Sequence, residues 1–309
     1  MKSVDYELVI IGGGPAGLTA GLYAARGGLN VVLIEKIVPG GQIIITDWIE
    51  NYPGFPEGLS GPDLVQKMTD QVKRFDLPIE NNEVVSVDFS EPVKKITLND
   101  RTLTTHAIII ATGASPKKLG VPGEETFYGK GISSCATCDG PFFKDSIVAA
   151  VGGGDTAVQE SLFLTKFAKK VYLIHRRDKL RAAAILQKRA LANEKIEMIW
   201  DSVLTDISGL THVENITVKN VKTDDKIQFS VDGCFIWVGT IPNTQFLKNS
   251  VKLDEYGFIV ADLNMETSVP GVFAAGDVRN TPLRQVVTAV GDGAIAAISA
   301  ENYIENIKK

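Results

Sequence analysis

Short apolar runs, separated by glycine-rich turns and helical segments, dominate the pattern along the chain. The first run, Tyr6–Ile11, has the composition of a β-strand, and a turn with the spacing G-x-G-x-x-G follows it. The alanine-rich segment that continues to about Arg26 predicts a helix. The next apolar run, residues 30–34, predicts a second strand and is closed by Glu35. This order of strand, glycine turn, helix, strand and acid is typical of a dinucleotide-binding unit.

Each element of this turn meets a physical need of a bound dinucleotide. Gly12 makes the tight turn, Gly14 lets a pyrophosphate approach the backbone, and Gly17 lets the helix pack closely on the strand. The phosphates then meet free N–H groups at the helix N-terminus. Glu35 stands where an acid accepts hydrogen bonds from the hydroxyls of a ribose.

The same pattern recurs in the middle of the chain. Ser146–Val151 is another apolar strand, and Gly152 and Gly154 follow it in the spacing G-x-G-x-x-A. A helical stretch leads to Lys170–Ile174, which ends at His175. A single glycine pattern is weak evidence, whereas two copies in matched strand and helix context are strong. We therefore expect two nucleotide-binding units in one α/β chain.

The two copies differ at the end of their second strand. The first ends in Glu35, whereas the second ends in His175, Arg176 and Arg177, with Arg181 shortly after. A carboxylate repels a 2'-phosphate, and guanidinium groups bind one through bidentate hydrogen bonds. As a charge run alone, these arginines are typical of a solvated helix face, but their position favours NADP(H). The first site then suits FAD, because flavin relays electrons from a hydride donor to other acceptors.

Composition and charge exclude several other classes of protein. The chain has 309 residues, which suits two domains, and its 44% apolar and 22% charged residues are close to globular averages. The net charge of -5 gives no electrostatic reason to expect nucleic acid. Apolar runs such as residues 107–111 are far shorter than the roughly 20 residues of a membrane span. The start carries acidic residues and leads into the glycine turn, so we expect no export signal and a cytoplasmic protein.

The three cysteines are too few for a disulfide scaffold. Cys135 and Cys138 form a C-x-x-C pair, which in a reducing compartment is redox-active or metal-binding. A closed zinc site needs four ligands, and the chain adds only Cys234 and three histidines, none in a second closely spaced pair. We therefore expect no metal and a dithiol that exchanges electrons with flavin. Cys234 lies in an apolar run, so we expect it to be a small buried hydrophobe.

Taken together, these motifs resemble the low-molecular-weight thioredoxin reductases of bacteria. The resemblance extends in order from about residue 5 to about residue 305. It rests on G-G-G-P-A-G at 12–17, G-G-Q at 40–42, E-N-Y-P-G at 50–54, A-T-G-A at 111–114, C-A-T-C-D-G at 135–140, H-R-R-D-x-x-R at 175–181, G-D-V at 276–278 and R-Q-V-V-T-A at 284–289.

The resemblance implies a fold and a domain arrangement. It implies two Rossmann-like domains, each a three-layer (ββα) α/β structure. The FAD domain would be discontinuous, with residues 1–116 and 246–309, and the NADP(H) domain would be inserted at 117–245. The two crossings would form a hinge about which the inserted domain rotates between half-reactions.

The resemblance also implies the reaction. Electrons would pass from NADPH through FAD and the Cys135/Cys138 disulfide to oxidised thioredoxin, the protein substrate. Cys138 would face the flavin, Cys135 would be the interchange thiol that attacks thioredoxin, and Asp139 would manage the proton of the dithiol. A homodimer is implied as well.

The cofactor contacts that the resemblance implies fall into two sets, one for each glycine turn. The implied FAD contacts are Gly12, Gly14, Pro15, Ala16, Glu35, Gly41, Gln42, Thr46, Asn51, Ala111, Thr112, Gly113, Gly276, Asp277, Arg284, Gln285 and Val286. The implied NADPH contacts are Gly152, Gly154, Asp155, Thr156, His175, Arg176, Arg177 and Arg181. We expect the last long helix to run from Arg284 to about Ile304, although Gly291 and Gly293 weaken its middle.

Related enzymes of other classes remain alternatives. Peroxiredoxin-reducing relatives carry an extra N-terminal domain, which we do not expect here. Relatives that use ferredoxin or oxygen tend to lose the arginine motif, which is intact at residues 175–181. Phe142 and Phe143 follow the C-x-x-C turn; we expect one to belong to a thioredoxin-docking surface near Lys130, although at least one could be a core residue.

Overall fold

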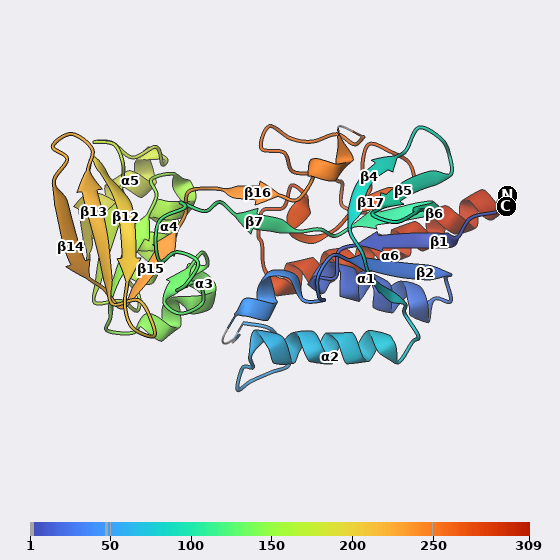
Figure 1. Ribbon diagram of the computed structural model, residues 1–309, viewed down its shortest axis with the longest axis horizontal. Coiled ribbons are helices and arrows are strands. Elements are labelled where there is room, and N and C mark those ends of the chain that lie inside the picture. Colours follow the sequence, from blue (N-terminus) through green and yellow to red (C-terminus); the bar gives the residue numbers. More distant parts are fainter. Residues whose placement is uncertain (1–2, 47–48, 50, 249) are drawn as a thin grey trace. The chain divides into compact units, whose positions relative to one another are not determined.

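The chain forms two compact units, each built around its own sheet. The computed structural model describes residues 3–46, 49, 51–248 and 250–309. Unit 1 comprises Met1–Ser115 and Ile241–Lys309, and unit 2 comprises Pro116–Thr240, so unit 2 is inserted into unit 1 along the sequence (Figure 1).

The sheet of unit 1 is parallel around the first glycine turn. Its strands are β1 (Tyr6–Ile11), β2 (Val31–Glu35), β3 (Ile79–Asn81), β4 (Val84–Asp88), β5 (Lys94–Leu98), β6 (Thr102–Ile110) and β17 (Val272–Ala274). They lie in the order β3-β2-β1-β6-β5-β4, and β17 also pairs with β6. β1 runs parallel to both β2 and β6, whereas β4 and β5 are antiparallel to their neighbours.

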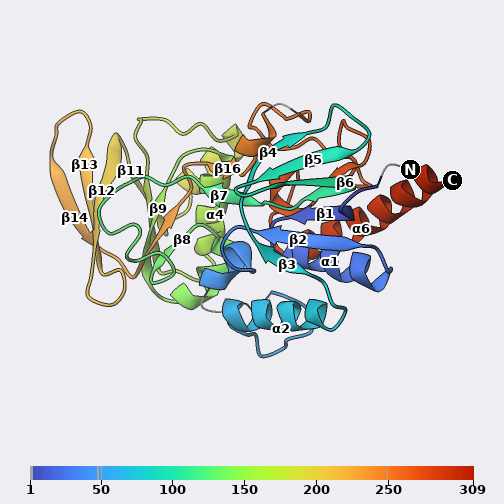
Figure 2. The same cartoon turned by 45° about the vertical axis from the view of Figure 1, so that its right-hand side comes forward.

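Helices cover one face of this sheet. They are α1 (Pro15–Arg26), α2 (Gly61–Lys73) and α6 (Val286–Lys308). The 3-10 turns of the unit are η1 (Gly41–Ile45), η3 (Gln245–Leu247) and η4 (Gly276–Val278), and Leu247 of η3 packs in the core on the opposite face of the sheet. α1 and α6 lie side by side along the sheet (Figures 1 and 2). Side chains of β1 such as Leu8 and Ile10 are fully buried against them, while Val9 and Ile11 point into a second core on the other face.

Unit 2 repeats this layering with its own elements. They are β8 (Ile132–Ser133), α3 (Ala136–Asp139), η2 (Gly140–Phe143), β9 (Ile147–Val151), α4 (Asp155–Leu164), β10 (Lys170–Ile174), α5 (Ala184–Leu191), β11 (Ile196–Ile199), β12 (Ser202–Ser208), β13 (Asn215–Asn220), β14 (Lys226–Ser230) and β15 (Gly233–Ile236). A parallel sheet, β11-β10-β9-β15-β8, has α4 in the core on one face and an antiparallel sheet, β12-β13-β14, in the core on the other. The predicted α/β class, with two Rossmann-like glycine-turn units, is thereby confirmed.

The chain crosses between the units at two short strands. β7 (Ala114–Pro116) and β16 (Thr240–Pro242) pair with each other. Within unit 1, the backbone N–H of Asn243 donates to the carbonyl of Gly113 at 3.0 Å, and its side-chain amide donates to the carbonyl of Thr112 at 2.8 Å.

The predicted elements agree with the observed ones near both glycine turns, and differ at the last helix. α6 begins at Val286, two residues later than expected, and continues to Lys308, past Ile304. Gln285 is its N-cap and exchanges hydrogen bonds with Thr288 in a capping box, which fixes the start. The glycines do not interrupt the helix. A Cβ at Gly293 would lie 2.2 Å from the carbonyl oxygen of Ala16, so this glycine permits close packing on α1.

Across the described residues, no helix combines the length and the apolar character needed to cross a bilayer. In the same part of the chain, no three His, Cys, Asp or Glu side chains lie together in a group that could hold a metal ion.

Candidate active site

The first glycine turn joins β1 to α1 and leaves open space in front of the helix. Gly12 has a positive φ of 105°, which favours glycine. A Cβ at Gly17 would lie 1.8 Å from the carbonyl oxygen of Gly12, so only glycine lets the helix approach the strand this closely. A Cβ at Gly14 would meet no atom of the described residues within 4 Å. Pro15 and Ala16 then open α1, and free N–H groups at the start of a helix suit an anion.

Glu35 ends β2 beside this turn. Its Oε2 accepts a hydrogen bond of 2.6 Å from the backbone N–H of Gly13, and its Oε1 accepts one of 3.0 Å from Ile37. The carboxylate is therefore held in one orientation next to the helix N-terminus. A carboxylate accepts several hydrogen bonds at once, so it retains lone pairs for the hydroxyls of a ribose.

The loop after β2 brings more of the predicted FAD contacts to the same end of the sheet. Gly41 and Gln42 lie in η1, which Thr46 follows, and Gln42 Nε2 donates to the carbonyl of Ala114 at 3.1 Å. Asn51 Nδ2 donates to Gln285 Oε1 at 2.9 Å. Glu50 of the E-N-Y-P-G motif lies outside the described residues.

The A-T-G-A segment follows β6 directly beside the glycine turn. The backbone N–H of Ala111 donates to the carbonyl of Ile11 at 2.8 Å, and Gly113 has a positive φ of 67°. Thr112 Oγ1 donates to the carbonyl of Asn243 at 2.8 Å. Hydrogen bonds thus hold the segment to β1 and to Asn243, the residue that follows β16.

The turn η4 and the start of α6 complete the cluster in unit 1. Gly276 has a positive φ of 76°, and a Cβ there would lie 3.0 Å from that of Ala16. Burial raises the pKa of Asp277 to about 6; Arg284 opposes this rise and Asp292 reinforces it. Arg284 lies 4.2 Å from the ring centre of Phe258.

Two observations indicate that these residues fit a flavin dinucleotide. The backbone leaves open space at Gly14, in front of the N-terminus of α1. The Nε of Arg284 is buried and has no hydrogen-bond partner among the described residues. Such a donor calls for a polar group from outside the chain.

The second glycine turn joins β9 to α4 in unit 2. A Cβ at Gly154 would again meet no atom within 4 Å. Gly152 precedes it at the turn, and Asp155 and Thr156 open α4 with exposed side chains. Asp155 Oδ1 accepts a hydrogen bond of 2.6 Å from the backbone N–H of Ala183. The first residue of the helix is therefore tied to the loop that follows β10.

That loop carries the arginine motif. His175 is only 5% exposed and packs on Gly153, where a Cβ would lie 2.2 Å from its Nδ1. Burial lowers the pKa of His175. The backbone N–H of Arg181 donates to the carbonyl of Gly153 at 2.7 Å, which folds the loop back onto the turn.

The three arginines of the motif point into solvent. Arg176, Arg177 and Arg181 are exposed and lie on a loop, not on a helix face. Their guanidinium groups make no ion pair with any residue that the structure describes. They therefore form a local positive surface beside the second glycine turn.

The C-x-x-C pair forms a disulfide at the short helix α3. Cys135 is its N-cap, and Cys138 is joined to it through their sulfur atoms. The backbone N–H of Cys138 donates to Cys135 Sγ at 3.2 Å, and the N–H of Cys135 donates to Ser133 Oγ at 3.0 Å. Asp139 closes the helix, with its N–H donating to the carbonyl of Cys135 at 3.1 Å. Cys135, Cys138 and Asp139, the three residues of the predicted redox turn, thus lie within one helical turn.

The structure separates the two phenylalanines that follow. Phe143 packs in the core, with its ring 5.3 Å from that of Phe235. Phe142 is 48% exposed. Cys234 is fully buried as predicted, and burial raises the pKa of its thiol to about 12.

Sequence reasoning missed two groups of charged residues. Burial raises the pKa of Glu160 on α4, whose carboxylate lies near the backbone N–H of Ala136 at the redox turn. Arg279 and Asp292 form a buried ion pair beside η4. Asp292 could have been found from the sequence, because a charged residue on the buried face of a predicted helix requires a partner of opposite charge.

Comparisons with known proteins show the family of the chain. Residues 6–293 match the family described as pyridine nucleotide-disulphide oxidoreductase. A thioredoxin reductase of Peptoclostridium litorale is 46% identical over 308 residues, covering 98% of each chain. One from Listeria monocytogenes is 47% identical over 307 residues, covering 98% of this chain and 95% of the relative.

A solved structure is similar over nearly the whole chain. The crystal structure of thioredoxin reductase from Streptococcus pyogenes MGAS5005 has a TM-score of 0.93 and 47% identity, and the match covers 97% of this chain and 98% of that one. The chain therefore belongs to the pyridine nucleotide-disulphide oxidoreductases and, within that family, to the thioredoxin reductases.

Proposed function

We propose that this protein is a cytoplasmic NADPH-dependent reductase of thioredoxin that contains FAD. The observation that carries the proposal is the Cys135–Cys138 disulfide, which lies in the same unit as an exposed arginine loop beside a glycine turn. One turnover moves two electrons from NADPH to the thioredoxin disulfide. The hydride and one solvent proton become the hydrogens of two thiols.

Unit 1 is the proposed FAD domain. The N–H groups at the start of α1 and the open space at Gly14 suit the pyrophosphate, and Glu35 suits the adenosine ribose. Asp277 suits the ribityl chain, and the N-terminus of α6 favours negative charge at the flavin ring. Bound there, FAD supplies the two-electron relay between a nicotinamide and a disulfide.

Unit 2 is the proposed NADP(H) domain. The proposed domain boundaries are residues 1–116 and 246–309 for the FAD domain and residues 117–245 for the NADP(H) domain. The backbone N–H groups of Gly154, Asp155 and Thr156 at the start of α4 suit the pyrophosphate. Arg176 and Arg177 suit the 2'-phosphate, because they are exposed and carry no carboxylate partner among the described residues.

The two cysteines have different proposed roles. The Cys135 thiolate attacks one sulfur of the thioredoxin disulfide, and the thiolate that leaves takes up a proton. Cys138 then attacks Cys135 Sγ, restores the Cys135–Cys138 disulfide and releases reduced thioredoxin. Asp139 holds and returns the proton during these exchanges. We also propose that the two units rotate between half-reactions, because nicotinamide and dithiol require the same face of the flavin.

The function is tested by NADPH oxidation with oxidised thioredoxin, small disulfides and oxygen as acceptors. Cys135→Ser and Cys138→Ser should both abolish thioredoxin reduction while NADPH still bleaches the flavin absorbance. The partner for trapping is a thioredoxin that lacks its resolving cysteine and whose remaining cysteine carries a thionitrobenzoate disulfide. Cys138→Ser should form a mixed disulfide with it and release thionitrobenzoate, and Cys135→Ser should trap far less. Equal trapping on non-reducing gels would overturn the assigned roles. Faster turnover with oxygen than with thioredoxin would overturn the function.

Phe142 is a proposed contact for thioredoxin. It is exposed one turn after the disulfide, and exposed aromatic side chains often contribute strongly to interfaces. Phe142→Ala should raise the KM for thioredoxin several-fold without changing turnover of a small disulfide. Ile227→Ala, which removes another exposed apolar side chain of unit 2, is the matched control.

A homodimer is also proposed. Val287, Ile295 and Ile298 form an exposed aliphatic stripe along α6, on the face opposite its buried alanines. Such a stripe suits a second copy of the chain. Sedimentation of the purified protein, with Ile298→Glu as the disrupting variant, measures the oligomeric state.

A further inference from the structure

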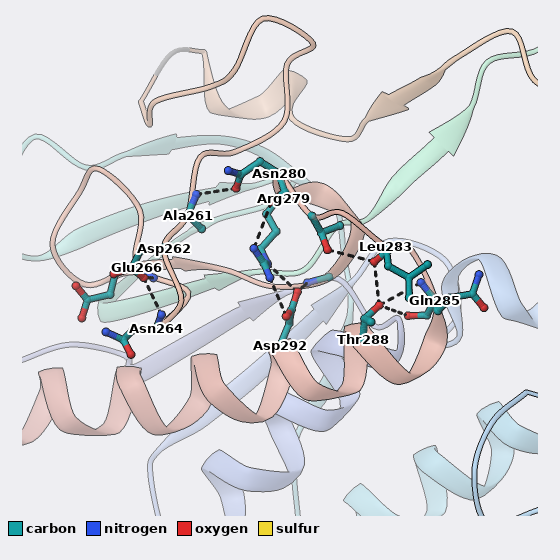
Figure 3. Close-up of polar contacts among 12 residues, drawn as sticks. Ala261, Asp262, Asn264, Glu266, Arg279, Asn280, Leu283, Gln285, Thr288 and Asp292 are labelled. Carbon is teal, nitrogen blue, oxygen red and sulfur yellow. Dashed lines mark hydrogen bonds and ion pairs between the residues drawn. The ribbon is translucent and has the colours of Figure 1, made fainter. Parts of the chain in front are cut away.

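A buried ion pair joins the η4 turn to the last helix. Asp292 lies on the inner face of α6 and is 8% exposed. Its Oδ2 accepts from Arg279 Nε at 2.7 Å, and its Oδ1 accepts from Arg279 Nη2 at 3.0 Å. The backbone N–H of Gly276 donates to Oδ2 as well, at 3.1 Å. Figure 3 shows Arg279 reaching from its loop to Asp292 on the helix.

The three donors bracket the turn that carries Asp277. Gly276 is the first residue of η4, and Arg279 is the residue directly after it. One carboxylate therefore binds both ends of the turn. The turn contacts other elements too. The backbone N–H of Ala275 donates to the carbonyl of Ile110 at 3.0 Å, and that of Ile259 donates to the carbonyl of Val278 at 3.0 Å.

The same turn packs against the helix of the first glycine motif. A Cβ at Gly276 would lie 3.0 Å from that of Ala16 on α1 and 3.5 Å from that of Ala289 on α6. A small shift of the turn would therefore move Asp277 relative to the N-termini of both helices. Precise placement of a binding side chain requires such support from its neighbours.

We propose that Arg279 and Asp292 are positioning residues for the flavin site, a charge-balanced clamp that holds the Asp277 turn against α1 and α6. The inference rests on the proposed FAD site of unit 1. Arg279 has two tasks in it. Its planar fork fixes the geometry of the Asp292 carboxylate, and its charge neutralises that carboxylate beside Asp277.

The charges around the turn explain why neutralisation matters. Among the described residues, four charged groups interact around this turn: Asp277, Asp292, Arg279 and Arg284. Burial already raises the pKa of Asp277, and Asp292 raises it further. Without Arg279, the turn would hold two carboxylates near one guanidinium group. Either Asp292 or Asp277 would then take up a proton or move.

The test measures FAD binding to apo-protein by the quenching of flavin fluorescence, together with the thermal unfolding of the apo-protein. Arg279→Met keeps most of the aliphatic part of the side chain but removes the charged guanidinium group with its two hydrogen-bond donors to Asp292. Asp292→Asn removes the opposing charge but keeps an acceptor for the Gly276 N–H. The double variant removes both charges. Arg279→Lys keeps the charge without the fork, and Arg101→Met, which breaks an exposed ion pair with Glu80 in the same unit, is the control.

We expect Arg279→Met to weaken FAD binding by about tenfold or more near pH 8, and by less near pH 5.5, where protonation relieves the excess charge. The double variant should recover most of that loss, and Arg279→Lys should lie between the wild type and Arg279→Met. Arg101→Met should bind FAD as the wild type does.

Several outcomes would overturn the clamp. It is wrong if Arg279→Met binds FAD like the wild type, if the double variant is no better than the single one, or if the loss is the same at both pH values. If Arg279→Met does not fold, Arg279→Lys and the double variant still give the comparison. Failure of wild-type protein to bind FAD would instead overturn the proposed function.

Discussion

The two glycine turns share a backbone plan and differ in the side chains that close them. At the first turn, Glu35 is a direct acceptor for the N–H of Gly13. At the second, His175 packs on Gly153 and forms a hydrogen bond with the backbone of Gly152, and the backbone N–H of Arg181 donates to the carbonyl of Gly153. One strand end therefore presents an oriented carboxylate, and the other presents exposed cations. This difference is the basis of our proposal that the first site binds a plain ribose and the second a phosphorylated one.

The helices that follow the turns differ as well. α1 begins at Pro15 with no acid in its first turn, whereas α4 begins at Asp155, which binds the backbone of the arginine loop. The third motif position is Gly17 in the first copy and Ala157 in the second. Gly17 thus lets the first helix pack closely on its strand, and Asp155 binds the second helix to the end of the arginine loop.

Exchanging glycine and alanine at the third motif position should have the largest effect. The Cβ of Gly17→Ala would lie 1.8 Å from the carbonyl oxygen of Gly12, so helix or turn must move. We expect a loss on the order of 3 kcal/mol in the free energy of unfolding, because such overpacking cannot relax easily, and loss of bound FAD. Ala157→Gly should cost only about 1 kcal/mol, from helix propensity. Urea unfolding and flavin absorbance measure both; equal costs would show that the two turns pack alike.

Removing the arginine charges should alter only the second site. Each charge-assisted hydrogen bond to a 2'-phosphate contributes about 1.5 kcal/mol or more, so Arg176→Ala with Arg177→Ala should lower kcat/KM for NADPH by roughly 100-fold. The value for NADH should stay nearly constant, since NADH lacks that phosphate. Lys188→Ala with Arg189→Ala, which removes two exposed positive charges from α5, is the charge-matched control. Equal losses with both cofactors would contradict the assignment.

Local patterns in the sequence were sufficient to predict the two turns. Tyr6–Ile11 and Lys170–Ile174 are strands as predicted, because an apolar run beside a glycine turn must pair within a buried sheet. The Cys135–Cys138 pair is three residues apart, so its proximity needed no knowledge of the tertiary structure. The roles of these residues toward the cofactors stay predictions.

Features that depend on tertiary packing could not be predicted. The bond between Arg279 and Asp292 joins a loop to a helix, and nothing in the sequence pairs them. Phe142 and Phe143 are identical residues, and only the position of Phe235 makes one of them a core residue. From the sequence, Gly293 is expected to destabilise its helix; only the structure shows that it allows close packing against the backbone of Ala16.

The pH response of Asp277 sharpens the comparison for the first unit. Burial raises the pKa of this carboxyl from 3.8 to about 6, with Arg284 opposing and Asp292 reinforcing the rise. The folded apo-protein then binds more protons than the unfolded chain between those values, so its stability falls as pH rises through that window. Asp277→Asn removes this loss and should stabilise the apo-protein by about 3 kcal/mol well above pH 6, while weakening FAD binding. Urea unfolding at low and neutral pH measures the slope; an unchanged slope would contradict the assignment to Asp277.

The smallest expected effect concerns the bond that only the second unit has. Asp155 Oδ1 accepts the N–H of Ala183 at 2.6 Å and so fixes the end of the arginine loop to α4. Because this bond is exposed, Asp155→Ala should cost about 1 kcal/mol and raise the KM for NADPH about fivefold, with FAD content unchanged. Asp155→Asn keeps an acceptor and should lose less. Asp63→Ala removes an acid from the first turn of α2 in unit 1 and serves as the control. If Asp155→Ala leaves the KM for NADPH unchanged, the loop is held by the Arg181–Gly153 bond alone, and the two units differ only in the charges that they present to the ribose.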